Sequence, residues 1–152
     1  MAINVKKTMI TLLLCIPAVF SYASGNTDNV TFSKVQNRLW KLEEVINGAA
    51  VISIERANAP KDIYTIRFQA GRLIGAGADN SYFTSYAIGK KHSLSIGKIG
   101  GSRVDPLYEM KNFTEHEYFQ CLEKADRWDF RNKKLELHTY DKNGAEIILL
   151  FF

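Results

Sequence analysis

The residues of this sequence that could carry out chemistry do not form a recognisable catalytic or metal-binding pattern. His92, His116 and His138 fall in three different expected elements, without the H-x₃₋₅-H or HExxH spacing that binds zinc. The sequence contains no Gly-x-Ser-x-Gly motif to expose a nucleophilic serine, and no cysteine–histidine pair with a protease signature. We therefore expect no enzyme activity, no catalytic residue, no metal and no cofactor.

The acidic residues near the one expected helix also have a simple interpretation. Glu115, Glu117, Glu123, Asp126 and Asp129 alternate with lysine and arginine residues. Such alternation is typical of a solvated helix face rather than of a paired acid and base. We therefore assign these carboxylates no catalytic role.

A glycine-rich turn is the next candidate site. Gly71, Gly75 and Gly77 are followed by aromatic strand residues, whereas a phosphate-binding loop has Gly-Lys-Ser/Thr opening a helix. We interpret them as turn and bulge glycines. Asp79 and Asn80 lie in the same turn, where they either cap its backbone or form a polar anchor at the rim of a pocket.

Aromatic side chains on the expected strands are candidates for packing or for binding. Aromatic residues dominate the packing of strands, so we expect most of them in the core. In a hollow barrel, some would instead line an apolar cavity that holds a lipid or another small apolar molecule. The candidates for such a lining are Trp40, Tyr64, Phe68, Phe83 and Trp128.

Strands must position all of these residues. Short alternating or apolar segments separated by turn signals predict strands at 39–42, 51–54, 63–68, 72–74, 82–88, 92–96, 98–99, 127–130, 135–140 and 146–152. The last strand is apolar on both faces, which places it in the middle of the structure. Asn143-Gly144 before it predicts a hairpin with a type I′ turn.

Only one helix is expected after the first 23 residues, within 112–124. Tyr118 and Leu122 recur there at helical spacing, and Asn112 with Glu115 forms a plausible capping pair. Many consecutive antiparallel strands with one late helix predict a mainly β fold. We expect a small closed or nearly closed antiparallel barrel, with the helix covering one side.

The first 23 residues have the three zones of a secretory signal peptide. Lys6 and Lys7 precede an apolar stretch, and Ser21-Tyr22-Ala23 places small residues at a cleavage site. The stretch is too short to span a bilayer, for which about 20 residues are needed. We expect cleavage after Ala23 and export to the periplasm or the extracellular space. Lipid anchoring at Cys15 is disfavoured because Leu14 is not small.

The expected organisation is therefore a signal peptide at 1–23, a flexible tether at 24–36 and one domain at 37–152. The whole chain has 20 basic and 16 acidic residues, so losing Lys6 and Lys7 leaves 18 and 16, a charge of +2. The charges are interspersed, which argues against nucleic-acid binding. Cys121 alone remains after cleavage, so no internal disulfide is possible. It is either a buried thiol or a reactive, dimer-forming one.

The ordered series of segments resembles the META domain, the family that includes the HslJ heat-inducible proteins. The likeness runs over 39–152 and rests on Leu39-Trp40-Lys41-Leu42, Ile46-Asn47-Gly48, Ile66-Arg67-Phe68, Gly71 to Gly75, Leu94-Ser95-Ile96, Ser102-Arg103-Val104, Leu135-Glu136-Leu137 and Asn143-Gly144. The resemblance implies a lipocalin-like barrel with an inserted helix, and envelope, secretion or stress roles without an established reaction. Its central turn matches Gly75, Gly77, Asp79, Asn80, Tyr82 and Tyr86, which we interpret as structural.

The chain departs from this family at two positions. Many members have one cysteine just before the central asparagine and another after the Ser/Thr-Arg segment. Here these places hold Asp79 and Asp105-Pro106. The disulfide that the resemblance implies between the two loops is therefore absent.

Three functions follow from these observations. The first is a non-catalytic accessory protein of the envelope or secreted space, peripheral to the membrane at most, that binds another envelope or extracellular protein. The second is a carrier of an apolar small molecule or lipid inside the barrel. The third is a small outer-membrane barrel, which the final strand disfavours because its faces do not alternate in polarity.

Overall fold

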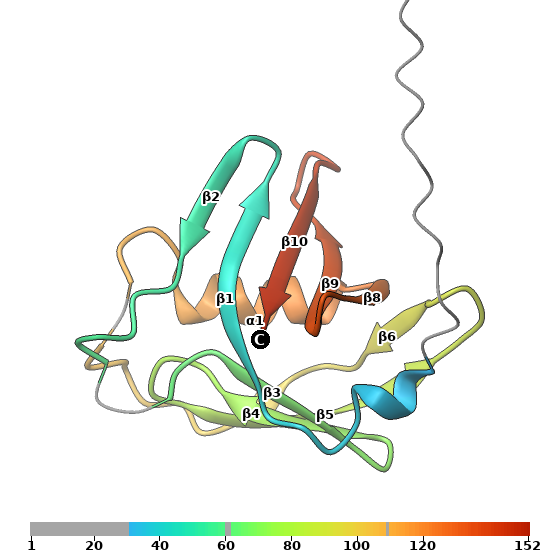
Figure 1. The fold of residues 1–152 in the computed structure, drawn as a ribbon. Coiled ribbons are helices and arrows are strands. Elements are labelled where there is room, and N and C mark those ends of the chain that lie inside the picture. Colours follow the sequence, from blue (N-terminus) through green and yellow to red (C-terminus); the bar gives the residue numbers. More distant parts are fainter. Residues whose placement is uncertain (1–30, 60–61, 109) are drawn as a thin grey trace, which may run out of the picture.

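The computed structural model describes residues 31–59, 62–108 and 110–152. The expected signal peptide and residues 24–30 of the expected tether lie outside this part of the chain. The described part is mainly β, with one α-helix inserted late (Figure 1). Its elements are η1 (Phe32–Lys34), β1 (Trp40–Asn47), β2 (Ala50–Ser53), β3 (Thr65–Gln69), β4 (Arg72–Ala76), β5 (Ser81–Ile88), β6 (Leu94–Ile96), β7 (Gly100–Gly101), α1 (Glu115–Lys124), β8 (Arg127–Arg131), β9 (Lys134–Tyr140) and β10 (Glu146–Phe151).

The strands form one antiparallel sheet that curls into a nearly closed barrel. Its order is β6-β5-β4-β3-β1-β10-β9-β8, while β2 pairs with β1 and β7 pairs with β5 outside this path. The two ends of the path meet where Leu94 N–H donates to Asp126 O at 2.8 Å and Trp128 N–H donates to His92 O at 3.0 Å. The expected mainly β barrel is confirmed.

β10 lies inside the sheet, as expected from its apolar sequence. It pairs with β1 on one side and with β9 on the other. Leu149 and Phe151 point into the barrel and are fully buried, whereas Ile148 and Leu150 lie on the outer face and are partly buried. The strand is therefore central in hydrogen bonding, although only its inner face is fully covered.

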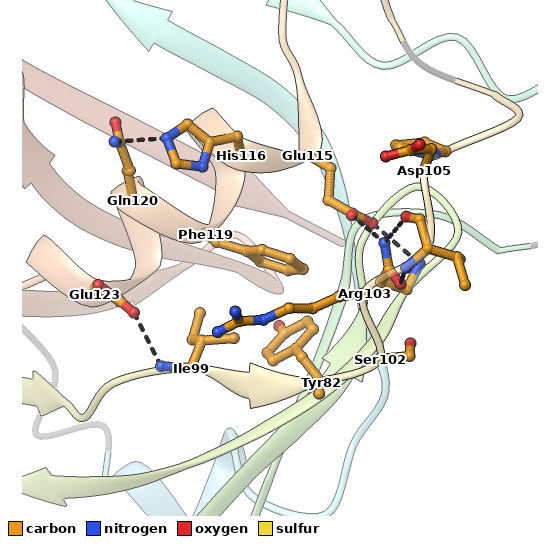
Figure 2. Close-up of a pocket in the computed structure, with 14 residues that line it drawn as sticks. Tyr82, Ile99, Ser102, Arg103, Asp105, Glu115, His116, Phe119, Gln120 and Glu123 are labelled. Carbon is orange, nitrogen blue, oxygen red and sulfur yellow. Dashed lines mark hydrogen bonds between the residues drawn. The ribbon is translucent and has the colours of Figure 1, made fainter.

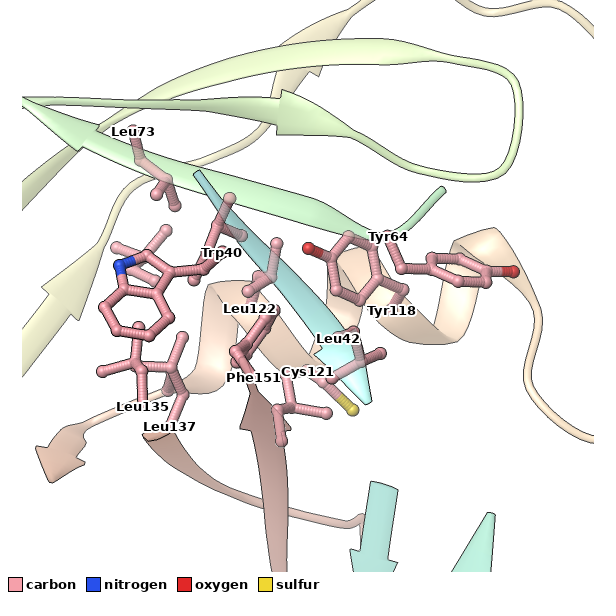
Figure 3. Packing of buried hydrophobic residues seen from close by; sticks show 14 of the residues in the cluster. Trp40, Leu42, Tyr64, Leu73, Tyr118, Cys121, Leu122, Leu135, Leu137 and Phe151 are labelled. Carbon is pink, nitrogen blue, oxygen red and sulfur yellow. The ribbon is translucent and has the colours of Figure 1, made fainter. Parts of the chain in front are cut away.

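Side chains occupy the interior of the barrel (Figure 3). Trp40, Tyr64 and Phe68 are fully buried and Trp128 is 2% exposed, so these residues pack in the core. Phe83 is different: it is 55% exposed, because Tyr82 and Thr84 take the inward positions of β5. The expectation that Phe83 lines an interior cavity is therefore wrong.

The fold begins earlier than expected, because the last part of the expected tether is packed. Val35 is fully buried, and its carbonyl accepts a hydrogen bond from Trp40 Nε1 at 2.9 Å. Phe32, in η1, makes edge contacts with Phe68 and Trp128, with ring centroids 5.1 and 4.9 Å apart. Residues 32–36 thus close one end of the barrel instead of forming a flexible tether.

The helix α1 begins two residues later than the expected capping pair predicts. Its N-cap is Thr114, whose Oγ1 accepts from Glu117 N–H while Glu117 Oε2 accepts from Thr114 N–H. This reciprocal pair is a capping box. Asn112 therefore does not cap the helix. Tyr118 and Leu122 face the core as their spacing predicts.

Two turns and one strand differ from expectation. Asn143-Gly144 does lie in the turn of a hairpin, between β9 and β10, but only Gly144 has positive φ, so the turn is not type I′. Positive φ at two consecutive turn residues occurs instead at Ala70-Gly71, Lys91-His92 and Asn132-Lys133, which lie between β3 and β4, between β5 and β6, and between β8 and β9. Residues 98–99 are not a strand, and the short β7 follows them. Within the described ranges, no helix is both long and apolar enough to cross a membrane.

Cys121 lies on the face of α1 that packs against the barrel. It is 8% exposed and lies near Leu42, Leu122 and Phe151 (Figure 3). Burial, and after it the charge of Glu117, raises the pKa of this thiol from 9.0 to about 11.

The raised pKa predicts that native Cys121 reacts slowly with iodoacetamide, because the thiolate is the nucleophile. At pH 8 about 0.1% of a thiol of pKa 11 is ionised, against about a quarter for an ordinary thiol of pKa 8.5. We expect alkylation of the folded protein to be on the order of 100-fold slower than in urea, measured by mass spectrometry. Equal rates in the two states would contradict the buried position.

Candidate functional site

The turn that follows β4 is the centre of the candidate site. Its backbone closes where Gly77 N–H donates to Asn80 O at 2.8 Å, and Tyr64 N–H donates to Gly77 O at 2.9 Å. Asn80 is 3% exposed. A buried polar side chain must find hydrogen-bond partners, and those of Asn80 come from two distant segments of the chain.

Glu115, the first residue of α1, is the first of these partners. Its Oε1 accepts from Asp79 N–H at 3.2 Å and from Asn80 N–H at 3.1 Å, and its Oε2 accepts from Asn80 Nδ2 at 2.6 Å. Glu115 is 6% exposed, so it does not belong to a solvated helix face. The interpretation of the acidic residues as solvated is wrong here, and also for Asp129, which is 8% exposed.

Two glycines allow this close approach. A Cβ added to Gly77 would lie 2.2 Å from Glu115 Oε1, and one added to Gly75 would lie 2.0 Å from Thr65 O. Neither contact is tolerable, because nonbonded carbon atoms pack at about 3.5–4.0 Å. The missing side chain at Gly77 therefore leaves room for the Glu115 carboxylate, and the missing side chain at Gly75 leaves room for the backbone of β3.

A second loop, 102–108, is joined to the turn by hydrogen bonds. Asn80 Nδ2 donates to Val104 O at 2.8 Å, and Val104 N–H donates to Asn80 Oδ1 at 2.9 Å. Asp79 Oδ2 accepts from Leu107 N–H at 2.6 Å and from Tyr108 N–H at 3.0 Å. These hydrogen bonds of the Asp79 and Asn80 side chains go to another loop and to Glu115 rather than to the backbone of their own turn, and Asn80 also lines a pocket.

Two tyrosines support the turn from inside the barrel. The hydroxyls of Tyr82 and Tyr118 both donate to Thr65 O, at 2.9 and 3.2 Å, and lie 3.2 Å from each other. Burial raises the pKa of Tyr82 and of Tyr118 far above the usual range. Both hydroxyls therefore stay protonated at physiological pH and act as structural donors.

A pocket of about 540 Å³ opens beside this cluster, outside the barrel, between α1 and loop 101–106 (Figure 2). Tyr82, Ile99 and Phe119 provide its apolar wall. The polar lining is Asn80, Ser102, Arg103, Asp105, Glu115, His116, Gln120 and Glu123.

Most of the polar groups in the pocket already have partners. Glu115 binds the turn, and His116 Nε2 lies 2.9 Å from Gln120 Nε2. Glu123 accepts from Ile99 N–H at 2.9 Å and from Lys98 Nζ at 2.7 Å. Burial raises the pKa of Glu123, but these bonds outweigh it, so that the net shift is downward and the carboxyl stays ionised.

Arg103 and Asp105 are the exceptions. Both are exposed, and neither makes a hydrogen bond or ion pair with any residue that the structure describes. In Figure 2 its side chain extends across the pocket, with Phe119 on one side and Ile99 on the other. Asp105 lies at the far end of the pocket from the guanidinium in this view. The arrangement presents a free guanidinium beside an apolar wall.

The residues matched to the expected family turn do not all lie together. Gly75, Gly77, Asp79, Asn80 and Tyr82 surround Glu115 or support its turn. Tyr86 lies farther along β5, where its ring packs against Phe68 at 4.9 Å and its hydroxyl accepts from Gln36 Nε2 at 3.0 Å. Tyr86 therefore belongs to the end of the barrel that η1 closes.

Sequence patterns give no sign of where Arg103, Glu115 and Phe119 lie in the fold. The spacing of Glu115 within its helix matches that of a solvated residue, and the partners that bury it are 35 residues or more away. Arg103 was noticed only as part of the Ser102-Arg103-Val104 resemblance. Neither residue carries a local signal of its place in the fold.

Comparison with known proteins identifies the family. A family model for the META domain matches residues 33–150. The chain belongs to the META-domain family. No curated protein matches its sequence.

Two solved structures share the fold of this META domain. One is a protein from Burkholderia xenovorans solved by NMR, with a TM-score of 0.59 and 19% identity over 84% of this chain and 94% of that one. The other is a DUF4847 family protein from Bacteroides vulgatus, with a TM-score of 0.53 and 15% identity over 79% of this chain and 94% of that one. At these identities the likeness shows the fold alone.

In this META domain, hydrogen bonds join the two loops that the expected family disulfide would connect. Asp79, which stands where the family resemblance implies one cysteine, accepts from Leu107 and Tyr108, and Asn80 binds Val104. These polar contacts join the two loops without a disulfide.

The role of Glu115 predicts that Glu115→Gln destabilises the domain, because an amide nitrogen would face donors at Asp79 or Asn80. We expect a loss of about 1–3 kcal/mol in the free energy of unfolding, measured by urea denaturation. Glu55→Gln is the matched control: its side chain is exposed, so a change below about 0.5 kcal/mol is expected. Equal effects of the two substitutions would show that the hydrogen bonds of Glu115 do not stabilise the domain.

Proposed function

We propose that this META domain is an exported, non-catalytic accessory protein that acts through binding, and that its ligand occupies the pocket between α1 and loop 101–106. The observation that carries the proposal is the unpartnered Arg103 guanidinium in a 540 Å³ hollow. Four of the five residues expected to line an interior cavity are packed in the core instead. A binding site on the outside of the barrel therefore has more support than a carrier function within it.

The chemistry of the pocket favours a carboxylate attached to an apolar group. A guanidinium binds a carboxylate through two parallel hydrogen bonds, and it does so most strongly where water is partly excluded. Phe119, Ile99 and Tyr82 offer an apolar surface next to it. The C-terminus of an envelope protein and a free organic acid both meet this description.

The buried tyrosines and the two bonded carboxylates at the pocket are poorly suited to general acid–base chemistry. The buried hydroxyls of Tyr82 and Tyr118 remain protonated, and the carboxylates of Glu115 and Glu123 are held by backbone donors. A general base needs a pKa near the working pH and access to the substrate. These residues are better suited to shaping a binding site than to moving protons.

Binding at Arg103 predicts that benzoate perturbs the amide signals of Arg103, Phe119 and Gln120 in an NMR titration, while uncharged benzamide does not. Arg103→Gln should weaken benzoate binding about 10-fold or more, since a hydrogen bond to a charged group contributes about 1.5–3 kcal/mol. Arg72→Gln, on exposed β4 surface, is the control and should leave binding unchanged. Benzoate binding to Arg103→Gln that is as tight as binding to the unaltered protein would contradict the proposed site.

Export is supported by the pattern of residues 1–23 and predicts a processed chain. Protein recovered from the envelope or the medium of its own host should begin at Ser24, as measured by intact mass. Ala23→Leu should block processing, because the peptidase requires a small residue there, whereas Ala18→Val within the apolar stretch should not. A full-length chain found only inside the cell would contradict export.

A further inference from the structure

We propose that Asp129, Glu136 and His138 form a binding site for a divalent transition-metal cation, of which Zn²⁺ is the reference. The three residues lie on the outer face of the β8–β9 hairpin, and no part of the pocket near Arg103 contributes to them. One ligand atom of each lies within 4.8 Å of the other two.

Strand register brings the three side chains together. Asp129 and Glu136 are directly opposite each other on β8 and β9, and His138 follows two residues after Glu136, so all three share one face. Trp128 and Leu137 point the other way, into the core. The two strands are joined by the tight Asn132-Lys133 turn, which keeps this register.

The cluster is more than a group of surface acids, because its histidine is buried and incompletely bonded. His138 is 3% exposed, and its Nε2 has no hydrogen-bond partner in the described part of the chain. This atom lies 3.5 Å from Glu136 Oε2. Asp129 is also buried, with 8% of its surface exposed.

The other ring nitrogen of His138 is held by two charged side chains. Nδ1 lies 2.9 Å from Glu146 Oε1 and 2.7 Å from Arg127 Nη2. The Nε2 side of the ring lies toward Glu136, whose Oε2 is 3.5 Å away. A histidine held by a carboxylate in this way is the usual arrangement behind a metal ligand.

Three basic side chains, Arg127, Arg131 and His92, lie next to the proposed ligands. Arg131 Nη2 binds Asp129 Oδ2 at 2.6 Å, which leaves Oδ1 of the same carboxylate facing His92 Nδ1 at 3.3 Å. Arg127 Nη2 lies 2.9 Å from Glu146 Oε1 and 2.7 Å from His138 Nδ1.

The donor set selects the type of cation. One imidazole and two carboxylates suit a first-row transition metal better than Ca²⁺ or Mg²⁺, which prefer oxygen ligands alone. Tetrahedral Zn–N and Zn–O bonds of about 2.0–2.2 Å place ligand atoms about 3.3–3.6 Å apart. His138 Nε2 and Glu136 Oε2 are already 3.5 Å apart, so the Asp129 carboxylate has to move closer, by up to about 1.5 Å from within 4.8 Å. Water completes the coordination.

Calorimetric titration of the tag-free protein with ZnCl₂ at neutral pH tests the site. We expect saturable one-to-one binding and a rise in melting temperature with added Zn²⁺, since a ligand of the native state stabilises it. Glu136→Gln and His138→Gln should each weaken binding by about 100-fold or more, and Glu146→Gln by about 10–100-fold through loss of the support for His138.

Three controls separate this site from other zinc-binding groups. His116→Gln on α1, Glu55→Gln and Cys121→Ser should all leave the affinity unchanged. If His138→Gln fails to fold, Glu136→Gln, which replaces a less buried side chain by one of the same shape, still decides the question.

The competing explanation is a protonated histidine paired with Glu136 and Glu146, without a metal. In that case ¹⁵N NMR would show protons on both ring nitrogens of His138, and no saturable binding would appear at up to about 1 mM Zn²⁺. That result, or binding that survives both ligand substitutions, overturns the proposal.

Discussion

The buried carboxylate of Glu115 is the interaction on which the arrangement of this end of the barrel depends. A polar group removed from water is costly unless hydrogen-bond partners surround it. Here the partners are two backbone N–H groups of a tight turn and the amide of Asn80. The start of α1 and the turn after β4 are therefore fixed to each other, because neither can move without leaving donors or acceptors unpaired.

This constraint extends to the pocket. The side-chain amide of Asn80 also binds the backbone N–H and carbonyl of Val104, so loop 102–108 is fixed to the same cluster as Glu115. Arg103 precedes Val104 and is thus anchored at one end while its side chain remains free. A binding group whose backbone is fixed loses less entropy when it takes up a ligand, and this favours the binding role proposed for Arg103.

The sequence predicted the elements of the fold well, because their signals are local. Alternating apolar residues and turn dipeptides located most of the strands, and the spacing of Tyr118 and Leu122 located the helix. Phe83 was placed wrongly although its neighbours Tyr82 and Thr84 carry the inward alternation, since all aromatic residues were grouped together. The capping residue was missed because Asn112 and Thr114 both fit an N-cap, and only packing decides between them.

The candidate sites were harder to predict, because they depend on pairings between distant segments. Glu115 lies 35 residues from Asn80 in the sequence, and no spacing rule connects a helix start to such a turn. Asp129, Glu136 and His138 come together through a hairpin whose turn is Asn132-Lys133, without the glycine that usually announces one. Their residue types were visible, but their common face depends on a register that only the folded hairpin supplies.

Among the described residues, the outer surface of the barrel carries two candidate sites that differ in burial. At one, the Arg103 guanidinium makes no hydrogen bond beside an apolar wall; at the other, His138 Nε2 has no hydrogen-bond partner near Glu136. Folding alone does not favour either arrangement, because unpaired polar groups lower stability where they are buried and gain nothing where they are exposed. Arg103 is exposed and imposes little cost, so its pocket is compatible with weak, reversible binding. His138 is buried, and a buried nitrogen without a hydrogen-bond partner lowers stability. A cation bound to it would therefore stabilise the β8–β9 hairpin.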